Sequence, residues 1–319
     1  MKLNIKTTLV IPCYKVENHL EKVIASVPEC ISSIILVNDA SPDNTGNIIN
    51  QLANENSRII AIHHSKNQGV GGAMLSGFHK AIEMGCDIVV KIDGDGQMDT
   101  RYIPEMITCL SESNYQYVKG NRFHNRSMLN QMPVLRRMGN LFMGFLLKSA
   151  SGYWQISDPT NGYFAIQTKT LREIDFKHIS KRFFFESSLL IALYYTGARI
   201  KDIGMPAIYL REKSNLSILK SILFFPPKIF IAYWRRIWLR YFIYDFNIGS
   251  IYIFFGLLLF LFGLIFGLIK WIHYASIQTP APTGTIMLAV LSFILGFQML
   301  LSAIQYDITS KNPFQSNYE

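Results

Sequence analysis

Two carboxylates stand two residues apart in the segment Asp93-Gly94-Asp95-Gly96-Gln97, which follows the apolar run IVVKI. Carboxylate and amide oxygens are the ligands that Mg²⁺ and Mn²⁺ prefer, and both ions share their coordination sphere with phosphate oxygens. The glycines allow tight turns and the close approach of a diphosphate. An EF-hand calcium loop is excluded, because Pro104 stands where that loop needs its twelfth-residue glutamate. The segment predicts a site for a divalent cation and a diphosphate, with a solvated acidic turn as the alternative.

The elements that must position these carboxylates alternate between short apolar runs and helical patterns. Strands are predicted at Thr7–Pro12, Ser33–Asn38, Arg58–His63 and Ile88–Asp93. Helices are predicted at Val16–Val27, after Ser41-Pro42-Asp43 and at Gly69–Met84. This alternation predicts βαβ units, a mostly parallel sheet and right-handed crossovers. Ligands of such sheets bind beyond the carboxyl ends of the strands, where the acidic and glycine-containing turns fall.

The pattern between Tyr102 and about Leu216 is mixed. Helices are predicted around Pro104–Ser111 and Val134–Ser149 and at Arg182–Tyr195, and no strand is assigned between them. The four cysteines, Cys13, Cys30, Cys86 and Cys109, lack metal-ligand spacing, and they are interpreted as free structural thiols in a reducing compartment.

The composition changes after residue 216. Residues 217–241 are rich in aromatic and cationic side chains, which predicts a helix in the headgroup region of a membrane, with a buried core helix as the alternative. Residues 248–269 and 284–306 are stretches of 22 and 23 residues without a charge, each long enough to span a bilayer. Residues 270–283, with Pro280 and Pro282, form a polar connector between them.

The charge distribution favours a membrane over nucleic acid as the partner. The formal net charge is +9, and cations cluster just before the first uncharged stretch; no nucleic-acid motif is present. Two spans bring both ends to one side, and the preceding cations place that side in the cytoplasm. The N-terminus has no signal-peptide pattern, so the first domain is expected to be cytoplasmic.

Four segments at the ends of predicted strands carry a resemblance when they are taken in order. They are Thr8–Tyr14 (TLVIPCY), Val37–Ser41 (VNDAS), Asn67-Gln68-Gly69 and the DGDGQ segment. Together they resemble the family 2 glycosyltransferases, whose nucleotide-sugar-binding fold is called GT-A, and the resemblance covers about residues 5–216. It implies an α/β fold with a Rossmann-like, mostly parallel sheet and flanking helices.

The resemblance also implies roles for single residues in binding a nucleotide-sugar. Asp39 would hydrogen-bond the nucleotide base, with Pro12 and Tyr14 beside the same ligand. Asp93, Asp95 and Gln97 would act at the Mg²⁺ or Mn²⁺ ion and the diphosphate, with Asp95 as a catalytic residue. Ala40 stands where a glycine is frequent in the family, which is a small departure.

The second half of the chain resembles the polyprenyl-phosphate branch of this family, typified by dolichyl-phosphate mannose synthase. The segments that carry this resemblance are Gly120–Arg122, Arg136-Arg137, Asp158–Tyr163, Arg182–Glu186 and Arg211–Ser214. Two anionic substrates need several cations, and Arg122, Arg137, Arg211 and Lys213 could supply them, with Arg122 as a catalytic residue and the other three at the acceptor phosphate. The alternative for each is a surface cation.

The acceptor decides whether the reaction needs a base. A lipid phosphate is already ionised, so alignment and stabilisation of the leaving diphosphate suffice. A sugar hydroxyl would need a base, for which Asp158 is the first candidate and Glu186 the second, although Asp158 also suits a structural turn. No spacing supports metal binding by His63, His64 or His124, which are expected to be structural or exposed.

The sequence therefore predicts a metal-dependent, inverting glycosyltransferase of the inner membrane that acts in cell-envelope glycan or lipid modification. The donor would be a UDP- or GDP-sugar and the acceptor undecaprenyl phosphate. Transfer to a hydroxyl of a lipid-linked oligosaccharide or polysaccharide and a non-catalytic nucleotide-sugar-binding scaffold are the alternatives; the oligomeric state is open, a homo-oligomer included. The predicted parts are a catalytic domain at 1–216, a juxtamembrane segment at 217–247, a transmembrane hairpin at 248–306 and a cytoplasmic tail at 307–319.

Overall fold

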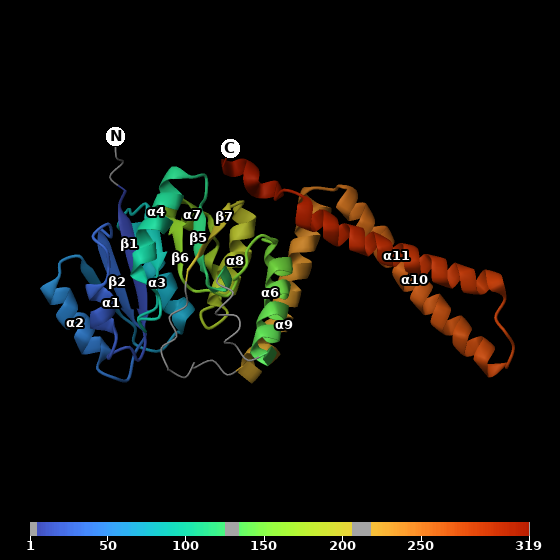
Figure 1. The fold of residues 1–319 in the computed structure, drawn as a ribbon, viewed down its shortest axis with the longest axis horizontal. Helices are drawn as coiled ribbons and strands as arrows, with labels where there is room; N and C mark the ends of the chain where they lie inside the picture. The colour runs from blue at the N-terminus through green and yellow to red at the C-terminus, as the bar shows by residue number, and fades with distance from the viewer. Residues whose placement is uncertain (1–4, 125–133, 206–217, 319) are drawn as a thin grey trace. The chain divides into compact units, whose positions relative to one another are not determined.

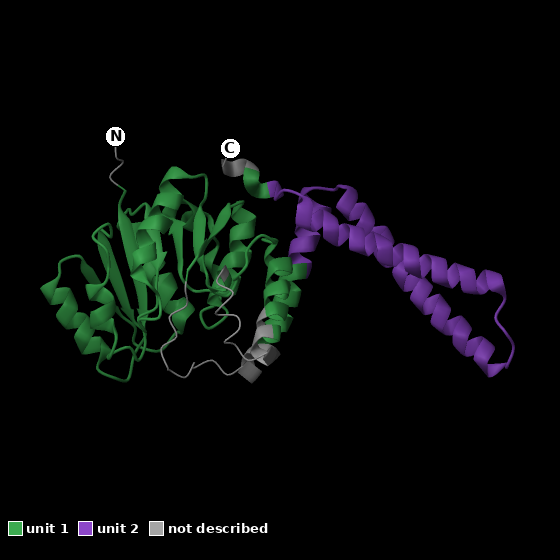
Figure 2. Cartoon of the chain, viewed as in Figure 1, with its two compact units in different colours: residues 1–233, 314–319 green, residues 234–313 purple. Residues whose placement is uncertain are grey.

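The computed structural model describes residues 5–124, 134–205 and 218–318 and divides the chain into two compact units (Figure 2). The first unit comprises residues 1–233 and 314–319, and the second comprises residues 234–313. The chain thus leaves the first unit, forms the second and returns to the first. The division into four parts expected from the sequence stays a prediction.

The first unit is built on a mixed sheet of seven strands in the order β3-β2-β1-β4-β6-β5-β7 (Figure 1). The strands are β1 Thr7–Cys13, β2 Ser33–Asn38, β3 Ile59–His63, β4 Ile88–Lys91, β5 Tyr117–Asn121, β6 Phe164–Gln167 and β7 Ile200–Gly204. Only β6 is antiparallel to its neighbours in the described sheet. The carboxyl ends of β1, β2, β4, β5 and β7 and the beginning of β6 therefore meet at one edge.

Helices cover both faces of this sheet. They are α1 Leu20–Ala25, α2 Thr45–Glu55, α3 Val70–Glu83, α4 Ile103–Glu112, α7 Thr168–Glu173 and α8 Phe185–Thr196. A further helix, α6 Val134–Ser151, packs against α8. One buried apolar cluster packs α3, α7 and α8 on one face, and a second packs α1, α2 and α4 on the other. Alternate residues of β4 enter opposite clusters, Val89 the first and Val90 the second, as the two-residue period of a strand requires.

The four predicted strands and the predicted α/β fold are confirmed, with two informative differences in length. The helix predicted at Val16–Val27 is reduced to α1, because Pro28 cannot continue a helix and the backbone turns at its start. The strand predicted to reach Asp93 ends at Lys91, so that Asp93 belongs to the turn. The sequence did not assign β5, β6 and β7, which have only four or five residues each.

The second unit consists mainly of two long helices, α10 Ile248–Ser276 and α11 Thr283–Thr309, packed against each other. Both helices are longer than the uncharged stretches of the sequence. In α10, for example, Lys270 and His273 continue the helix up to the proline-containing link. Glycines let the two backbones approach closely: a Cβ atom on Gly263 would lie 2.4 Å from the backbone nitrogen of Phe293. Most of the outward-facing side chains are apolar and exposed. By length and composition, these are the two helices in the described chain that could cross a membrane.

A buried ionic cluster lies at the base of this pair of helices. It joins α11 to the end of α9 (Ile218–Trp238) and to the turn that follows α9. Arg236 donates to both carboxylate oxygens of Asp307 at 2.9 and 2.8 Å, and Arg240 and Tyr241 donate to Asp307 Oδ1 at 3.0 and 2.9 Å. All four side chains are buried. Buried charges need such pairing, so the cluster fixes the end of α9 to α11.

Asp307→Ala should destabilise the second unit, because two buried arginines would lose their carboxylate. Breaking a buried ion pair by removing one partner costs about 3–5 kcal/mol. The measurement is thermal unfolding of the full chain in detergent, followed by helical circular dichroism. Asp245→Ala is the matched control, since Asp245 is exposed in the same unit and should cost less than about 1 kcal/mol. Equal losses in the two variants would contradict a structural role for the cluster.

Candidate active site

The acidic turn predicted to bind a metal lies at the carboxyl edge of the sheet. The turn is closed by a hydrogen bond from the backbone nitrogen of Gln97 to Asp95 Oδ1 at 3.0 Å. Gly96 has a φ of 75°, a left-handed conformation that glycine adopts without steric cost. The side chain of Asp93 is 34% exposed, and Asp95 and Gln97 are half-buried. The carboxylates are therefore accessible to a ligand at this edge.

The residues of this turn fit a hard divalent cation. Asp93 and Asp95 supply carboxylate oxygens and Gln97 an amide oxygen, and a diphosphate and water would complete the sphere. Among the described residues there is no group of three histidine, cysteine or acidic side chains that could enclose a metal.

Asp39, predicted to contact the nucleotide base, holds a neighbouring turn in this structure. Its side chain is 3% exposed, and it accepts hydrogen bonds from the backbone nitrogens of Gln68 at 2.8 Å and Gly69 at 2.7 Å. His64 Nδ1 lies 2.8 Å from Asp39 Oδ1, and His64 Nε2 lies 2.9 Å from Ser76 Oγ. These contacts fix the start of α3. A contact between Asp39 and a base stays a prediction.

Pro12 and Tyr14 lie where β1 reaches the same edge. Pro12 pairs with Val37 of the neighbouring strand β2, and the ring of Tyr14 is 41% exposed. Ala40, the position where the family often has glycine, has a φ of 51°. This left-handed conformation explains the glycine, because a Cβ atom there is sterically unfavourable. An exposed aromatic ring beside this turn suits stacking on a base.

Asp158 and Arg122, both predicted to be catalytic, form a pair. Asp158 is fully buried, and it accepts hydrogen bonds from Arg122 Nε at 2.7 Å, Arg122 Nη2 at 3.0 Å and the Arg122 backbone nitrogen at 3.2 Å. Burial alone would raise the pKa of Asp158, but the hydrogen bonds and charge of Arg122 outweigh it and hold the pKa below its usual value. The side chain of Arg122 is 39% exposed. The buried carboxylate of Asp158 therefore holds the guanidinium of Arg122 in place, while part of this side chain stays accessible to solvent.

The segment after Asp158 is tied to both halves of the site. Asn161 Nδ2 donates to the carbonyl of Gly120 at 2.7 Å, which anchors this segment to β5. The hydroxyl of Tyr163 donates to the carbonyl of Asp99 at 2.9 Å, which connects it to the acidic turn. The short antiparallel strand β6 thus brings the arginine-bearing half beside the metal-binding half.

Two buried lysines at this edge were not among the predicted site residues. Lys91 is fully buried, and its ammonium lies 2.7 Å from Asp93 Oδ1 and 3.3 Å from Glu186 Oε1. Burial alone would lower the pKa of Lys91, but the two carboxylates outweigh it and hold the pKa above its usual value. Burial lowers the pKa of Lys119, at the same level on β5, to about 8. The sequence signal that could have identified these two residues is a lysine within an otherwise apolar strand.

The remaining predicted residues are placed only in part. Arg137 lies in α6, but the structure does not describe its side chain, and Arg211 and Lys213 lie outside the described residues. Their role at an acceptor phosphate stays a prediction. His63 bonds to Asn38 and Asn50 at 3.1 and 2.9 Å, so both His63 and His64 belong to polar networks.

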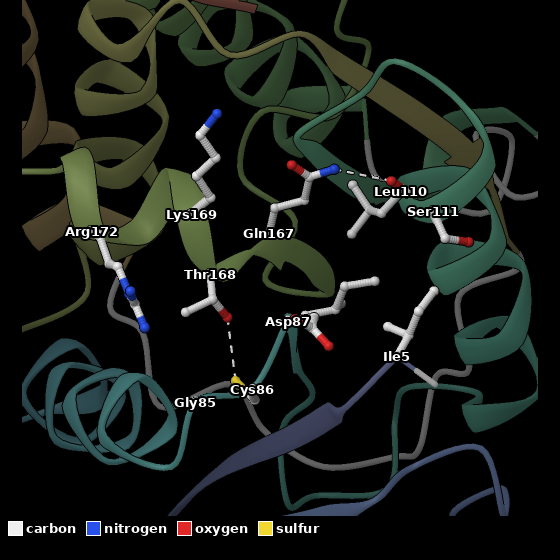
Figure 3. A pocket seen from close by; sticks show the side chains of 11 residues that line it. Ile5, Gly85, Cys86, Asp87, Leu110, Ser111, Gln167, Thr168, Lys169 and Arg172 are labelled. Atoms are coloured by element: carbon white, nitrogen blue, oxygen red, sulfur yellow. Dashed lines mark hydrogen bonds between the residues drawn. The ribbon is translucent and has the colours of Figure 1, made fainter. Parts of the chain in front are cut away.

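A hollow of about 510 Å³ lies at the opposite edge of the sheet (Figure 3). It is lined at the beginning of β4 by Cys86 and Asp87 and across from them by Thr168 and Arg172. The Sγ atom of Cys86 and the hydroxyl of Thr168 are hydrogen-bonded to each other at 3.2 Å. The hollow is separated from the acidic turn by the length of β4, so it is not the site described above.

Comparisons with known proteins identify the family of this chain. The model of the family described as Glycosyl transferase family 2 matches residues 8–175, more than half of the chain. The UDP-N-acetylglucosamine–dolichyl-phosphate N-acetylglucosaminyltransferase of Methanococcus voltae is 31% identical over 214 residues, which cover 63% of this chain and 85% of that protein. The undecaprenyl-phosphate mannosyltransferase of Micrococcus luteus is 30% identical over 183 residues, which cover 56% of this chain and 72% of that protein.

A solved structure supports the fold. The glucosyl-3-phosphoglycerate synthase of Mycobacterium tuberculosis, in complex with Mn²⁺, UDP and glucosyl-3-phosphoglycerate, superposes with a TM-score of 0.51 at 16% identity. The match covers 73% of this chain and 80% of that chain. With its GT-A fold and its relationship to polyprenyl-phosphate sugar transferases, this chain belongs to glycosyl transferase family 2 and is a glycosyltransferase.

Proposed function

We propose that this glycosyltransferase moves a sugar from a UDP- or GDP-sugar to a polyprenyl phosphate, undecaprenyl phosphate in a bacterial membrane. The observation that carries the proposal is the pair of Asp158 and Arg122, a half-exposed arginine held by a buried carboxylate at the same edge as the acidic turn. Among the described residues, the two candidate bases, Asp158 and Glu186, are each paired with a cation, whereas the side chain of Arg122 is partly exposed. An ionised phosphate needs a cation at its binding site and does not need a base.

The donor would bind across the carboxyl ends of β1, β2 and β4. Tyr14 lies at the end of β1 and suits the nucleotide base, and Asp93, Asp95 and Gln97 suit a Mg²⁺ or Mn²⁺ ion. When bound, such an ion would stabilise the charge that develops on the leaving diphosphate. Mn²⁺ and UDP in the mycobacterial structure are consistent with this assignment, although that structure is similar in fold alone.

The acceptor would bind beside Arg122. Its phosphate oxygen would attack the anomeric carbon as the bond to the diphosphate breaks, and such a single displacement inverts the configuration. Asp158 is poorly suited to remove a proton, because all its oxygens accept hydrogen bonds and its pKa is lowered. Glu186, the second candidate base, pairs with the ammonium of Lys91. The named relatives use dolichyl phosphate and undecaprenyl phosphate, which are acceptors of this class.

The first unit also exposes apolar surface that suits a membrane. In α6, Met138, Leu141, Phe142 and Phe145 follow a helical spacing on one face, and each is more than half exposed. In α9, Phe230 and Ile231 are also exposed, and α6 and α9 share a buried cluster that includes Leu147 and Ile229. Exposed apolar patches of this kind mark membrane interfaces. They support delivery of a lipid acceptor from the bilayer.

Topology gives a separate test of the membrane proposal. Residues 314–319 belong to the same compact unit as the catalytic residues, so both ends of the hairpin should be cytoplasmic. A reporter inserted at Gln278, in the link between α10 and α11, should report the far side of the inner membrane. Reporters before Met1 and after Glu319 should both report cytoplasm. A cytoplasmic signal at Gln278 would mean that the two helices do not span the membrane.

Arg122→Ala should raise KM for undecaprenyl phosphate about ten- to a hundredfold, since a charge-assisted contact is lost. Asp158→Asn should produce a similar rise because Arg122 loses the carboxylate that orients it. The double variant should be little worse than either single one, as expected for residues that act as a unit. The measurement is kcat and KM for the lipid acceptor, alongside nucleotide affinity.

The matched control for these variants is Arg172→Ala, which removes an arginine at the opposite edge and should leave KM unchanged. A hydroxyl acceptor makes the opposite prediction. Asp158→Asn would then reduce kcat about 10²–10⁴-fold through loss of a general base, while Arg122→Ala would leave the acceptor KM unchanged. That pattern would contradict the phosphate acceptor and favour a lipid-linked oligosaccharide.

A further inference from the structure

The ammonium of Lys91 is buried between two carboxylates from distant parts of the chain. Lys91 ends β4 and its side chain is 1% exposed; Asp93 follows in the acidic turn, and Glu186 lies in the first turn of α8. Burying an unpaired ammonium is costly, so its position must be fixed by these partners. Lys91 therefore connects the acidic turn to α8.

Gly162 provides the space for this contact. A Cβ atom at Gly162 would lie 2.5 Å from Lys91 Nζ and 3.2 Å from Glu186 Oε1, and it would be in ordinary van der Waals contact with Asp93 Oδ2 at 3.6 Å. The φ angle of Gly162 is not in the left-handed region, so the backbone does not itself require glycine there. The glycine is thus explained by the ammonium group that packs against it.

The contact with Lys91 also determines which carboxylate oxygen of Asp93 is available to a ligand. Lys91 engages Oδ1 of Asp93, and the structure shows no hydrogen bond from any described residue to Oδ2. The side chain of Asp93 is 34% exposed, so Oδ2 is the oxygen available to a ligand at the sheet edge. Lys91 is itself too buried to reach that ligand.

We infer that Lys91, held by Glu186, is a positioning residue that orients Asp93 for metal-dependent binding of the nucleotide. The inference rests on the proposed function, since it assigns a role within the donor site. Two simpler roles for Lys91 predict other results. A purely structural lysine would stabilise the fold without affecting the metal. A lysine that competed with the metal for Asp93 would weaken metal binding.

Gly162→Ala tests this inference, because it displaces the ammonium without changing any charge. The measurement is the affinity of the full-length protein for UDP and for GDP, each titrated in Mn²⁺ and in EDTA, together with the thermal unfolding midpoint. Wild type should bind one of the nucleotides more tightly in Mn²⁺. In Gly162→Ala this enhancement should fall about tenfold, while affinity in EDTA stays close to wild type. The unfolding midpoint should also fall, because the buried ammonium is displaced from its partners.

Two further variants complete the experiment. Gly139→Ala is the matched control, since nothing lies within 4 Å of a Cβ atom there, and it should behave as wild type. Lys91→Met removes the ammonium and should reduce the Mn²⁺ enhancement in the same direction as Gly162→Ala. Loss of thermal stability with an unchanged enhancement would overturn the inference in favour of a structural lysine. A larger enhancement in Lys91→Met would overturn it in favour of competition. No Mn²⁺ enhancement in wild type would overturn the proposed donor site as well.

Discussion

Charge balance at one edge of the sheet is the constraint on which this structure depends. Carboxylates that can hold a metal must lie beside cations that can hold an anionic acceptor, without neutralising one another. The chain keeps these opposite charges apart because each exposed side chain is paired with a buried one. The buried Asp158 pairs with Arg122, and the buried Lys91 pairs with Asp93. The buried members of these two pairs, Asp158 and Lys91, are thus each compensated by a charge of opposite sign.

The antiparallel strand β6 makes this arrangement possible. It lies between β4 and β5, so the Asp158–Gly162 segment that precedes it reaches the same edge as the acidic turn. Asn161 and Tyr163 then tie that segment to β5 and to Asp99. Under the proposed function, the donor and acceptor sites would therefore lie at one edge of the same sheet.

The sequence predicted the parallel strands because each is a clear apolar run that ends in a turn. It did not predict β6, whose four residues FAIQ carry no alternation, or the pairing of Lys91 with Glu186 across 95 residues of chain. Asp39 shows a different limit of prediction from sequence. Its contacts to the backbone of Gln68 and Gly69 leave no side-chain signature, so only the resemblance assigned it a role, and that role is still untested.

The most direct test of the account is product analysis with the full-length protein in detergent. Undecaprenyl phosphate would be incubated with each of a panel of UDP- and GDP-sugars in Mg²⁺, in Mn²⁺ or in EDTA, and the lipid would be identified by mass spectrometry. The account predicts one donor that adds a single sugar to the lipid phosphate, and no product in EDTA. Glycosylation confined to a lipid-linked sugar hydroxyl, or full product in EDTA, would contradict it.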